Sequence, residues 1–281
     1  MFQPDYFWAK PSRYTLFSAL VADNDTKVER GVSFGNEPRL KLDIYSPASK
    51  EAPVDQAGTG PVILFIYGGS WRKGDRAFYG FLGAALASRG IPTIIPDYRL
   101  YPEVRFPGFI HDVAEAYAWT WRRFRKPDGS PRPVVVMGHS AGGHMAAMLA
   151  FNREYIKRAN PDAAMPAGLV GLAGPYAFDL TTYGTTKDIF VPGQPVAETI
   201  PLNFATDAAP PTLLLHGAAD TTVKVWNAEQ LEGRLIDVDV PVTVKILDGV
   251  THMGLVTRLA WPFRRRSPAL DDILAFVRSL E

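Results

Sequence analysis

Ser140 is the central residue of the sequence Gly-His-Ser-Ala-Gly at residues 138–142, which matches the pattern G-x-S-x-G. The motif follows an apolar run at residues 134–137 and precedes an Ala- and Met-rich segment at residues 141–151. A strand, a sharp turn and a helix in this order project a serine hydroxyl from the turn, and glycines on both sides let the turn close. A serine that only capped the helix would not need both glycines. We therefore predict that Ser140 is a nucleophile.

Elimination among five histidines gives the general base. His252 follows the apolar run at residues 242–247 through a short loop, at the carboxyl end of a predicted strand, where ligands bind in parallel sheets. The other four lie in the serine turn, on its helix, on an earlier helix or at a strand end: His139, His144, His111 and His216. We predict that His252 accepts the serine proton.

Asp220 is the predicted acid of this triad. It stands just beyond a buried run, residues 213–215, and a glycine turn. The order Ser140, Asp220, His252 is that of α/β-hydrolases and differs from the two common serine-protease orders. Asp248, nearer to His252 in the sequence, is the alternative. In such a triad the carboxylate fixes the imidazole tautomer and stabilises the imidazolium.

Stabilisation of an oxyanion needs preorganised N–H donors. Residues 67–71 read Tyr-Gly-Gly-Ser-Trp and follow the first long apolar run, residues 62–67. Two glycines there let the backbone turn its N–H groups toward the serine. The predicted donors are the backbone N–H groups of Gly69, Ser70 and Ala141.

The elements that must position these groups alternate along the chain, which predicts an α/β fold with a mostly parallel sheet. Predicted strands cover residues 62–67, 93–96, 134–137, 169–172, 212–215 and 242–247. Before them, residues 28–34 and 40–45 form either an antiparallel hairpin or two edge strands. Predicted helices cover residues 77–89, 109–124, 141–151, 225–236 and 268–280. We expect a single domain, residues 1–281, with an N-terminal arm at 1–27. The Thr-, Pro- and Gly-rich residues 176–210 break the alternation and predict a small cap over the site.

Composition excludes several other classes of function. The chain has 281 residues, with 30 Lys and Arg against 29 Asp and Glu, so its charge gives no reason to expect nucleic acid or an anionic membrane as partner. It has no cysteine, which excludes disulfides and thiolate chemistry. No apolar run is long enough to span a membrane, and residues 15–22 make a poor signal peptide, so we expect a cytoplasmic protein. We predict no metal and no organic cofactor, and a homodimer is left open.

From residue 28 to its end, the chain resembles the α/β-hydrolase carboxylesterases related to hormone-sensitive lipase and to bacterial kynurenine formamidase. The resemblance rests on six parts of the sequence: residues 67–71, residues 97–100 with Pro102, residues 106–113, residues 138–143, residues 216–217 with Asp220, and His252. It implies an α/β-hydrolase fold and serine-dependent hydrolysis of esters or amides. The family's oxyanion motif begins with His where this chain has Tyr67, whose hydroxyl could brace the loop instead. Trp71 is similar to the formamidase variant of that motif. Residues from Asp97 onward either support the loop or pack at the end of a strand, and the sequence favours neither.

These residues predict an esterase acting on short-chain acyl or aryl esters, with Trp71 and Tyr176 contacting the substrate. Phe78, Tyr79 and Phe178 are further aromatic candidates for the pocket. The modest cap favours small soluble esters over emulsified triglyceride. Three alternatives are an arylformamidase-type amidase, an esterase that removes acetyl or feruloyl groups, and a non-catalytic scaffold. The scaffold is disfavoured because such proteins lose a triad residue or an elbow glycine, and all are present here.

Overall fold

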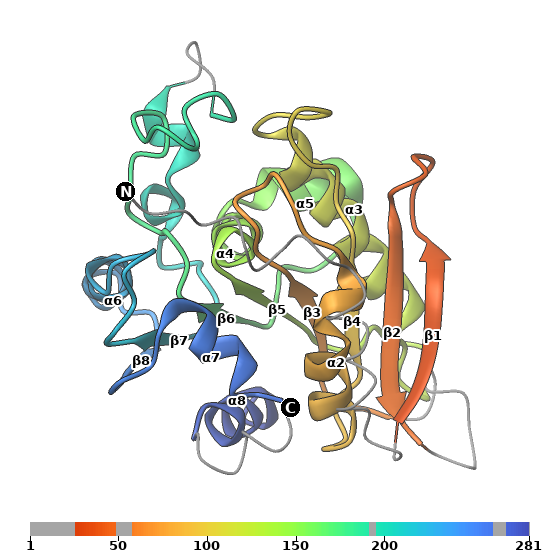
Figure 1. The fold of residues 1–281 in the computed structure, drawn as a ribbon. Helices are drawn as coiled ribbons and strands as arrows, with labels where there is room; N and C mark the ends of the chain where they lie inside the picture. Colours follow the sequence, from red (N-terminus) through yellow and green to blue (C-terminus); the bar gives the residue numbers. More distant parts are fainter. Residues whose placement is uncertain (1–25, 49–57, 191–194, 261–267, 281) are drawn as a thin grey trace.

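An eight-stranded sheet runs through the part of the chain that the computed structural model describes, residues 26–48, 58–190, 195–260 and 268–280. The strand order is β1-β2-β4-β3-β5-β6-β7-β8 (Figure 1). The strands are β1 (Thr26–Ser33), β2 (Lys41–Pro47), β3 (Val62–Ile66), β4 (Thr93–Pro96), β5 (Val134–His139), β6 (Gly168–Leu172), β7 (Thr212–Gly217) and β8 (Val242–Leu247). Pairing is antiparallel from β1 through β2 to β4 and parallel across the rest, which confirms the predicted mostly parallel α/β sheet.

The apolar runs of the sequence form the centre of this sheet. Every residue of β3, β5, β6 and β7 is buried, as expected for parallel strands covered on both faces. The edge strands β1 and β8 instead alternate between half-buried and exposed positions and have no fully buried residue. Because the central strands are parallel, the loops that follow β3, β5, β7 and β8 lie at one edge of the sheet, where the candidate site is built.

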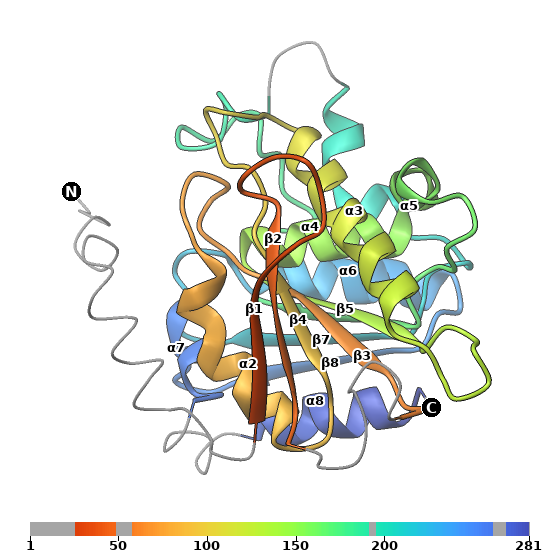
Figure 2. The same cartoon turned by 90° about the vertical axis from the view of Figure 1, so that its right-hand side faces the viewer.

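Helices cover both faces of the sheet (Figure 2). On one face lie α2 (Gly80–Ala87) and α8 (Ala269–Arg278), and on the other lie α3 (Gly108–Arg123), α4 (Ala141–Phe151) and α6 (Trp226–Asp237). Helix α5 (Arg153–Ala159) packs against α3. Helix α4 is buried along its whole length, because it is apolar on every side and lies directly over the central strands.

Three short elements differ from the sequence expectation. The predicted helix at residues 77–89 is a 3-10 turn, Arg76–Tyr79, followed by α2, and the Asp75 carboxylate caps the turn by accepting from the Ala77 N–H. Helices α5 and α7 (His252–Thr257) were not predicted. Each spans only one to two turns, which is too short for a hydrophobic period to show, and packing and caps stabilise them instead.

The connection from β6 to β7, residues 173–211, contains the predicted cap at 176–210 and lies on the side of the candidate site. We keep the name cap segment for this connection. It includes two 3-10 turns, Val196–Thr199 and Pro201–Phe204. Its anchor is Phe190, a fully buried ring that contacts Trp71, Phe106 and Phe109. The cap therefore shares the hydrophobic core, although it departs from the strand–helix alternation.

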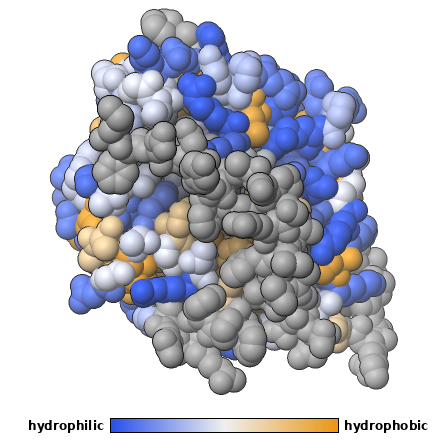
Figure 3. Space-filling model, in the orientation of Figure 1, coloured by the Kyte–Doolittle hydropathy of each residue, from blue (hydrophilic) through white to orange (hydrophobic). Residues whose placement is uncertain are grey.

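The face seen in Figure 3 is mainly hydrophilic outside the residues drawn in grey, with small apolar areas between polar ones. Most of the predicted N-terminal arm, residues 1–25, lies outside the described residues. The division into one domain with an arm and a cap stays a prediction.

Candidate active site

Ser140 stands at a strained turn between β5 and α4. Its backbone has φ 56° and ψ −121°, a conformation that non-glycine residues rarely adopt. The turn leaves no space for side chains at its two glycines. A Cβ on Gly138 would lie 2.1 Å from the Gly142 carbonyl oxygen, and one on Gly142 would lie 1.9 Å from that of Ile66. Both glycines are therefore required by close backbone approach.

The Ser140 side chain does not cap helix α4. It makes no capping hydrogen bond, although Ser140 occupies the N-cap position. Its backbone N–H donates to the Leu172 carbonyl at 2.9 Å, which fixes the turn to the end of β6. Ser140 is half-buried and lines a pocket, where a substrate could reach a nucleophile.

His252 and Asp220 are brought together from neighbouring loops. Asp220 follows β7, and His252 begins α7 after β8, the strand beside β7. The His252 Nδ1 lies 2.7 Å from the Asp220 Oδ2. A carboxylate accepts, so Nδ1 carries the proton and Nε2 is left as the basic nitrogen. Asp248, the alternative acid, has an exposed side chain.

Three donors hold the Asp220 carboxylate. The backbone N–H groups of Thr222 and Val223 donate to Oδ1 at 2.8 and 2.9 Å, and His252 Nδ1 donates to Oδ2 at 2.7 Å. His216 Nε2 lies 3.4 Å from the same oxygen and donates to the Val223 carbonyl at 2.9 Å. Burial alone raises the pKa of this carboxyl, but the hydrogen bonds and the attraction of His252 hold the pKa below its usual range. Asp220 is therefore an anion at neutral pH, as an orienting carboxylate must be.

His139 links the serine turn to His252. Its ring centroid lies 4.7 Å from that of His252, and its Nε2 donates to the His252 carbonyl at 3.2 Å. Burial, followed by repulsion from His252, lowers the pKa of His139 well below its usual value. His139 is thus a neutral spacer, and the backbone contact places His252 beside the Ser140 turn.

His144, one turn along α4, ties that helix to the cap. Its Nε2 donates to the Thr199 carbonyl at 2.8 Å, and its ring contacts Trp71 and Phe190 edge to face. The side chain is fully buried, and burial lowers the pKa of His144 to about 4. It is therefore a packed, hydrogen-bonded residue and not the base.

Acidification to pH 5 is expected to destabilise the protein through His144. Its folded pKa lies below the unfolded value, so the unfolded state takes up the proton first and stability falls as pH drops through about 6.5. Between pH 7.5 and 5 this single group should remove about 2 kcal/mol from the free energy of unfolding.

Urea unfolding at pH 7.5 and at pH 5 would measure this loss in the free energy of unfolding. The variant His144→Gln, whose amide can still donate to Thr199, should lose that part of the pH dependence. An unchanged dependence in His144→Gln would show that other groups cause it.

The loop after β3 carries the predicted oxyanion donors. Three successive residues have positive φ: Gly69 at 134°, Ser70 at 54° and Trp71 at 55°. A Cβ on Gly69 would lie 1.9 Å from the Lys73 carbonyl oxygen, so only glycine fits there. Within the described ranges, no protein oxygen accepts a hydrogen bond from the backbone N–H of Gly69, Ser70 or Ala141. Ser70 and Ala141 line the same pocket as Ser140, which suits them to meet a substrate oxygen.

Tyr67 braces this loop where the resembled family has histidine. Its fully buried hydroxyl donates to the Asp97 Oδ1 at 2.7 Å, and its ring stacks on Tyr98 with centroids 4.7 Å apart. Arg39 donates to the Tyr67 hydroxyl and to the Gly74 carbonyl. Burial, with the Asp97 charge next, raises the pKa of Tyr67 well above its usual value, so the phenol stays a donor.

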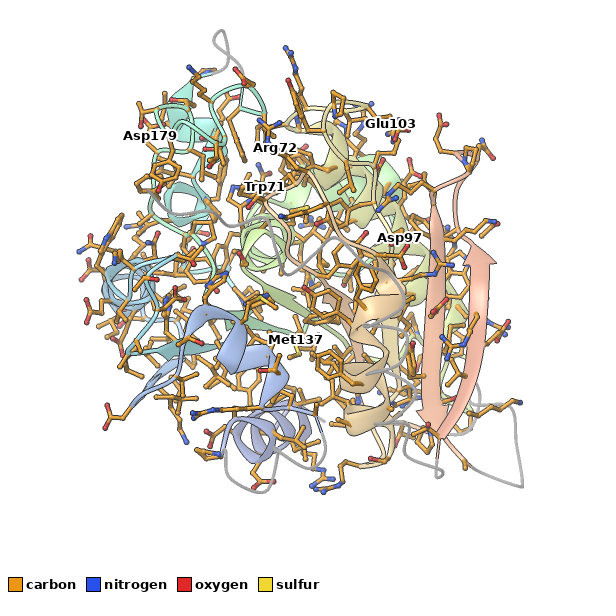
Figure 4. The ribbon with its side chains drawn as sticks, viewed as in Figure 1. Trp71, Arg72, Asp97, Glu103, Met137 and Asp179 are labelled. Carbon is orange, nitrogen blue, oxygen red and sulfur yellow. The ribbon has the colours of Figure 1, made fainter. Side chains whose placement is uncertain are left out.

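Asp97 in turn connects the loop to β2. Its carboxylate accepts from the Arg76 backbone N–H at 2.9 Å and pairs with the Arg76 guanidinium, which also binds Asp43 on β2. Figure 4 shows Asp97 on the side of the molecule that faces β2. Tyr67, Asp97 and Arg76 therefore brace the loop after β3 that carries the predicted oxyanion donors. Support of this loop was one of the two roles that the sequence allowed for the segment from Asp97 onward.

Tyr67→Phe is expected to lower kcat by about three- to tenfold with little change in KM, because the loop donors lose their buried anchor. The free energy of unfolding should fall by about 1–3 kcal/mol. Tyr117→Phe is a matched control: its buried hydroxyl donates to the Ala164 carbonyl, far from the loop in sequence. The control should lose stability and keep kcat. Equal kcat in Tyr67→Phe and wild type would refute the bracing role.

A pocket of about 240 Å³ opens beside Ser140. Trp71, Phe178, Tyr183 and Trp226 form its aromatic walls. Figure 4 places Trp71 and Arg72 on the same side of the sheet as the cap segment that carries Asp179. Trp71, predicted to contact substrate, therefore lies at the pocket, although only 2% of the residue is exposed.

Tyr176 was also predicted to contact the substrate, and the structure does not place it at the pocket. It is fully buried and does not line the pocket. Its hydroxyl accepts from the Gly174 N–H at 3.2 Å, and its ring fills the space left by Gly171 and Gly174. The chain turns inward just after β6, so Tyr176 packs in the core. The further candidates Tyr79 and Phe78 do not line this pocket either: Tyr79 is buried in the core, and Phe78 is half-buried.

Other pocket residues were missed by sequence reasoning. The loop after Asp220 contributes Thr221, Thr222, Val223 and Lys224, and the start of α6 contributes Trp226. The cap contributes Leu180, Tyr183, Thr185 and Thr186. Their position directly after the predicted acid was a usable signal for the first group. Nothing in the sequence distinguishes the second group from other cap residues.

No helix within the described ranges combines the length and hydrophobicity needed to cross a membrane. In those same ranges, no cluster of three or more His, Asp or Glu side chains is arranged to hold a metal ion.

This architecture, with the serine turn after β5 and the Asp–His pair after β7 and β8, is that of an α/β-hydrolase. Solved structures agree: esterase B from Lactobacillus rhamnosis superposes with a TM-score of 0.77 at 20% identity, covering 96% of this chain and 92% of that one. A hormone-sensitive lipase from a metagenome library superposes with a TM-score of 0.71 at 20% identity, covering 97% and 94%. At that identity the likeness establishes the fold.

Residues 112–278 match the prolyl oligopeptidase family, and the chain belongs to that family. Residues 42–169 also match the BD-FAE family. Esterase LipC of Mycobacterium tuberculosis is 30% identical over 81% of this chain and 60% of its own length. An isoprenylcysteine alpha-carbonyl methylesterase of Arabidopsis thaliana is 25% identical over 90% of this chain and 62% of its own. The chain thus spans less than two thirds of the length of these relatives.

Proposed function

We propose that this protein is a serine carboxylesterase that cleaves short-chain acyl or aryl esters. The observation that carries the proposal is the 2.7 Å hydrogen bond between His252 and Asp220. His252 also contacts His139, the residue next to Ser140 in the strained turn. The similarity to an esterase and to a methylesterase supports ester bonds as the target.

In the proposed reaction, Ser140 Oγ attacks the ester carbonyl carbon while His252 Nε2 takes the hydroxyl proton. The carbonyl oxygen becomes an oxyanion and accepts hydrogen bonds from the N–H groups of Gly69, Ser70 and Ala141. Asp220 stabilises the imidazolium, which then gives its proton to the leaving alcohol. A water molecule, deprotonated by His252, releases the acid and restores Ser140.

Pocket size supports short acyl groups. About 240 Å³ is below the usual range for pockets that enclose drug-sized ligands, about 300–1,000 Å³. The aromatic walls suit a small apolar or aryl group. A long acyl chain would have to leave the pocket, and its extra methylenes would add little to binding.

A hydrolysis panel tests the proposal: p-nitrophenyl acetate, butyrate, octanoate and palmitate, with methyl ferulate and N-formylkynurenine. We expect kcat/KM to be highest for acetate or butyrate and to fall by about tenfold or more at octanoate. A rate that increases steadily toward palmitate would contradict the short-chain preference. A dominant rate on N-formylkynurenine would place the enzyme among amidases, and one on methyl ferulate would favour a feruloyl esterase.

A further inference from the structure

Lys224 gives the pocket beside Ser140 a single positive charge. Sixteen described residues line the pocket, and Lys224 alone among them carries a formal charge. The remaining lining is aromatic, aliphatic, hydroxyl or amide. A neutral ester would need no ammonium group there, so the charge is a feature that the proposed ester hydrolysis leaves unexplained.

This ammonium group has no protein counter-ion in the part of the chain that the structure describes. No described carboxylate forms an ion pair or hydrogen bond with the Lys224 side chain. Asp220, four residues earlier, accepts hydrogen bonds from His252 and from two backbone N–H groups instead. The Lys224 charge is therefore available to a ligand.

The backbone at Lys224 is fixed to the cap. The buried Asn227 side chain donates to the Lys224 carbonyl at 3.1 Å and accepts from the Ala177 N–H at 3.2 Å. The Asn227 backbone N–H donates to the same carbonyl at 3.1 Å. These bonds hold the start of the Lys224 side chain at the pocket wall, while the exposed side chain keeps its ammonium hydrated until a ligand arrives.

We infer that the pocket selects esters that carry a carboxylate on their acyl or alcohol part, and that Lys224 is the residue that selects them. The inference rests on the proposed esterase function and names its substrate class. The aromatic group around Phe178, whose ring centroid lies 5.6 Å from that of Tyr183 and 6.2 Å from that of Trp226, would hold the apolar part of such a substrate. Lys224 would pair with its carboxylate.

The test compares esters matched in size. Mono-p-nitrophenyl glutarate and p-nitrophenyl valerate differ by a carboxylate on the acyl part, and 4-carboxyphenyl acetate and phenyl acetate differ by one on the alcohol part. The readout is the ratio of kcat/KM for the charged ester over the neutral one, in wild type, Lys224→Met and Lys224→Glu. Lys187→Met is the matched control, because Lys187 is an exposed cap lysine outside the pocket lining.

In at least one series, we expect Lys224→Met to lower this ratio by about two- to fivefold, the range of a solvent-accessible ion pair. Lys224→Glu should lower it further, and Lys187→Met should leave it unchanged. Salt at about 1 M should weaken the wild-type preference, because the screening length falls to about 3 Å. Ratios that stay the same in Lys224→Met in both series would overturn the inference.

A binding measurement separates this inference from the proposed function. Monomethyl glutarate and methyl valerate can be titrated into Ser140→Ala, with and without Lys224→Met, and followed by tryptophan fluorescence. Tighter binding of the glutarate that depends on Lys224 would support the inference even without turnover. Absence of any ester hydrolysis by wild type would instead count against the proposed function. Equal binding of both compounds would overturn the inference.

Discussion

Ser140→Ala is expected to reduce kcat for p-nitrophenyl butyrate by at least about 10⁴-fold, because loss of a triad nucleophile removes the acyl-enzyme route. The fold should be kept, since alanine at this position changes only the hydroxyl, which makes no capping bond with α4. Steady-state kinetics with purified protein measures the loss, and circular dichroism checks the fold.

Ser279→Ala is the matched control, because Ser279 is an exposed serine at the end of α8. It should retain wild-type kcat. Ser140→Ala with more than about a tenth of wild-type activity would refute the assignment of the nucleophile.

Asp220→Asn should lower kcat/KM by about 10³- to 10⁴-fold at neutral pH. The Asn carbonyl can still accept from the Thr222 and Val223 N–H groups, which keeps the loop in place. Its NH₂ group would then face His252, so Nδ1 can no longer donate and the imidazole is held in the wrong tautomer. The same variant measured from pH 6 to 9 shows whether a higher pH restores part of the rate.

Asp248→Asn discriminates between the two acids that the sequence allowed. Asp248 is exposed, whereas Asp220 is 5% exposed and binds His252. Asp248→Asn should remain within about twofold of wild type. A larger loss in Asp248→Asn than in Asp220→Asn would contradict the described geometry.

The strands and the triad positions could be predicted because their signals are local. Runs such as residues 134–137 are apolar without alternation, which predicts a strand buried on both faces, and a motif at such a strand end predicts a site. His252 and Asp220 were found by elimination and by chain order. Their contact across 32 residues follows from the pairing of β7 with β8, which the sequence predicted only as two strands of one sheet.

The pocket could not be predicted in the same way. Tyr176 and Phe178 are two residues apart and both aromatic, yet one fills the core above Gly171 and the other lines the pocket. Their difference depends on how the chain leaves β6, which no local pattern encodes. The bracing of Tyr67 by Asp97 and Arg76 likewise joins residues from separate segments: Tyr67 follows β3, Asp97 follows β4, and Arg76 begins a 3-10 turn. The sequence therefore indicated a role for Asp97 without its partners.

Covalent labelling with a fluorophosphonate tests the central claim, that Ser140 is the nucleophile of an esterase site, most directly. We predict one equivalent of adduct on the peptide that contains Ser140, identified by mass spectrometry, with loss of esterase activity in proportion to labelling and protection by a short-chain ester. Complete inactivation with the adduct on another residue would contradict the account. So would an enzyme that hydrolyses esters and stays unlabelled.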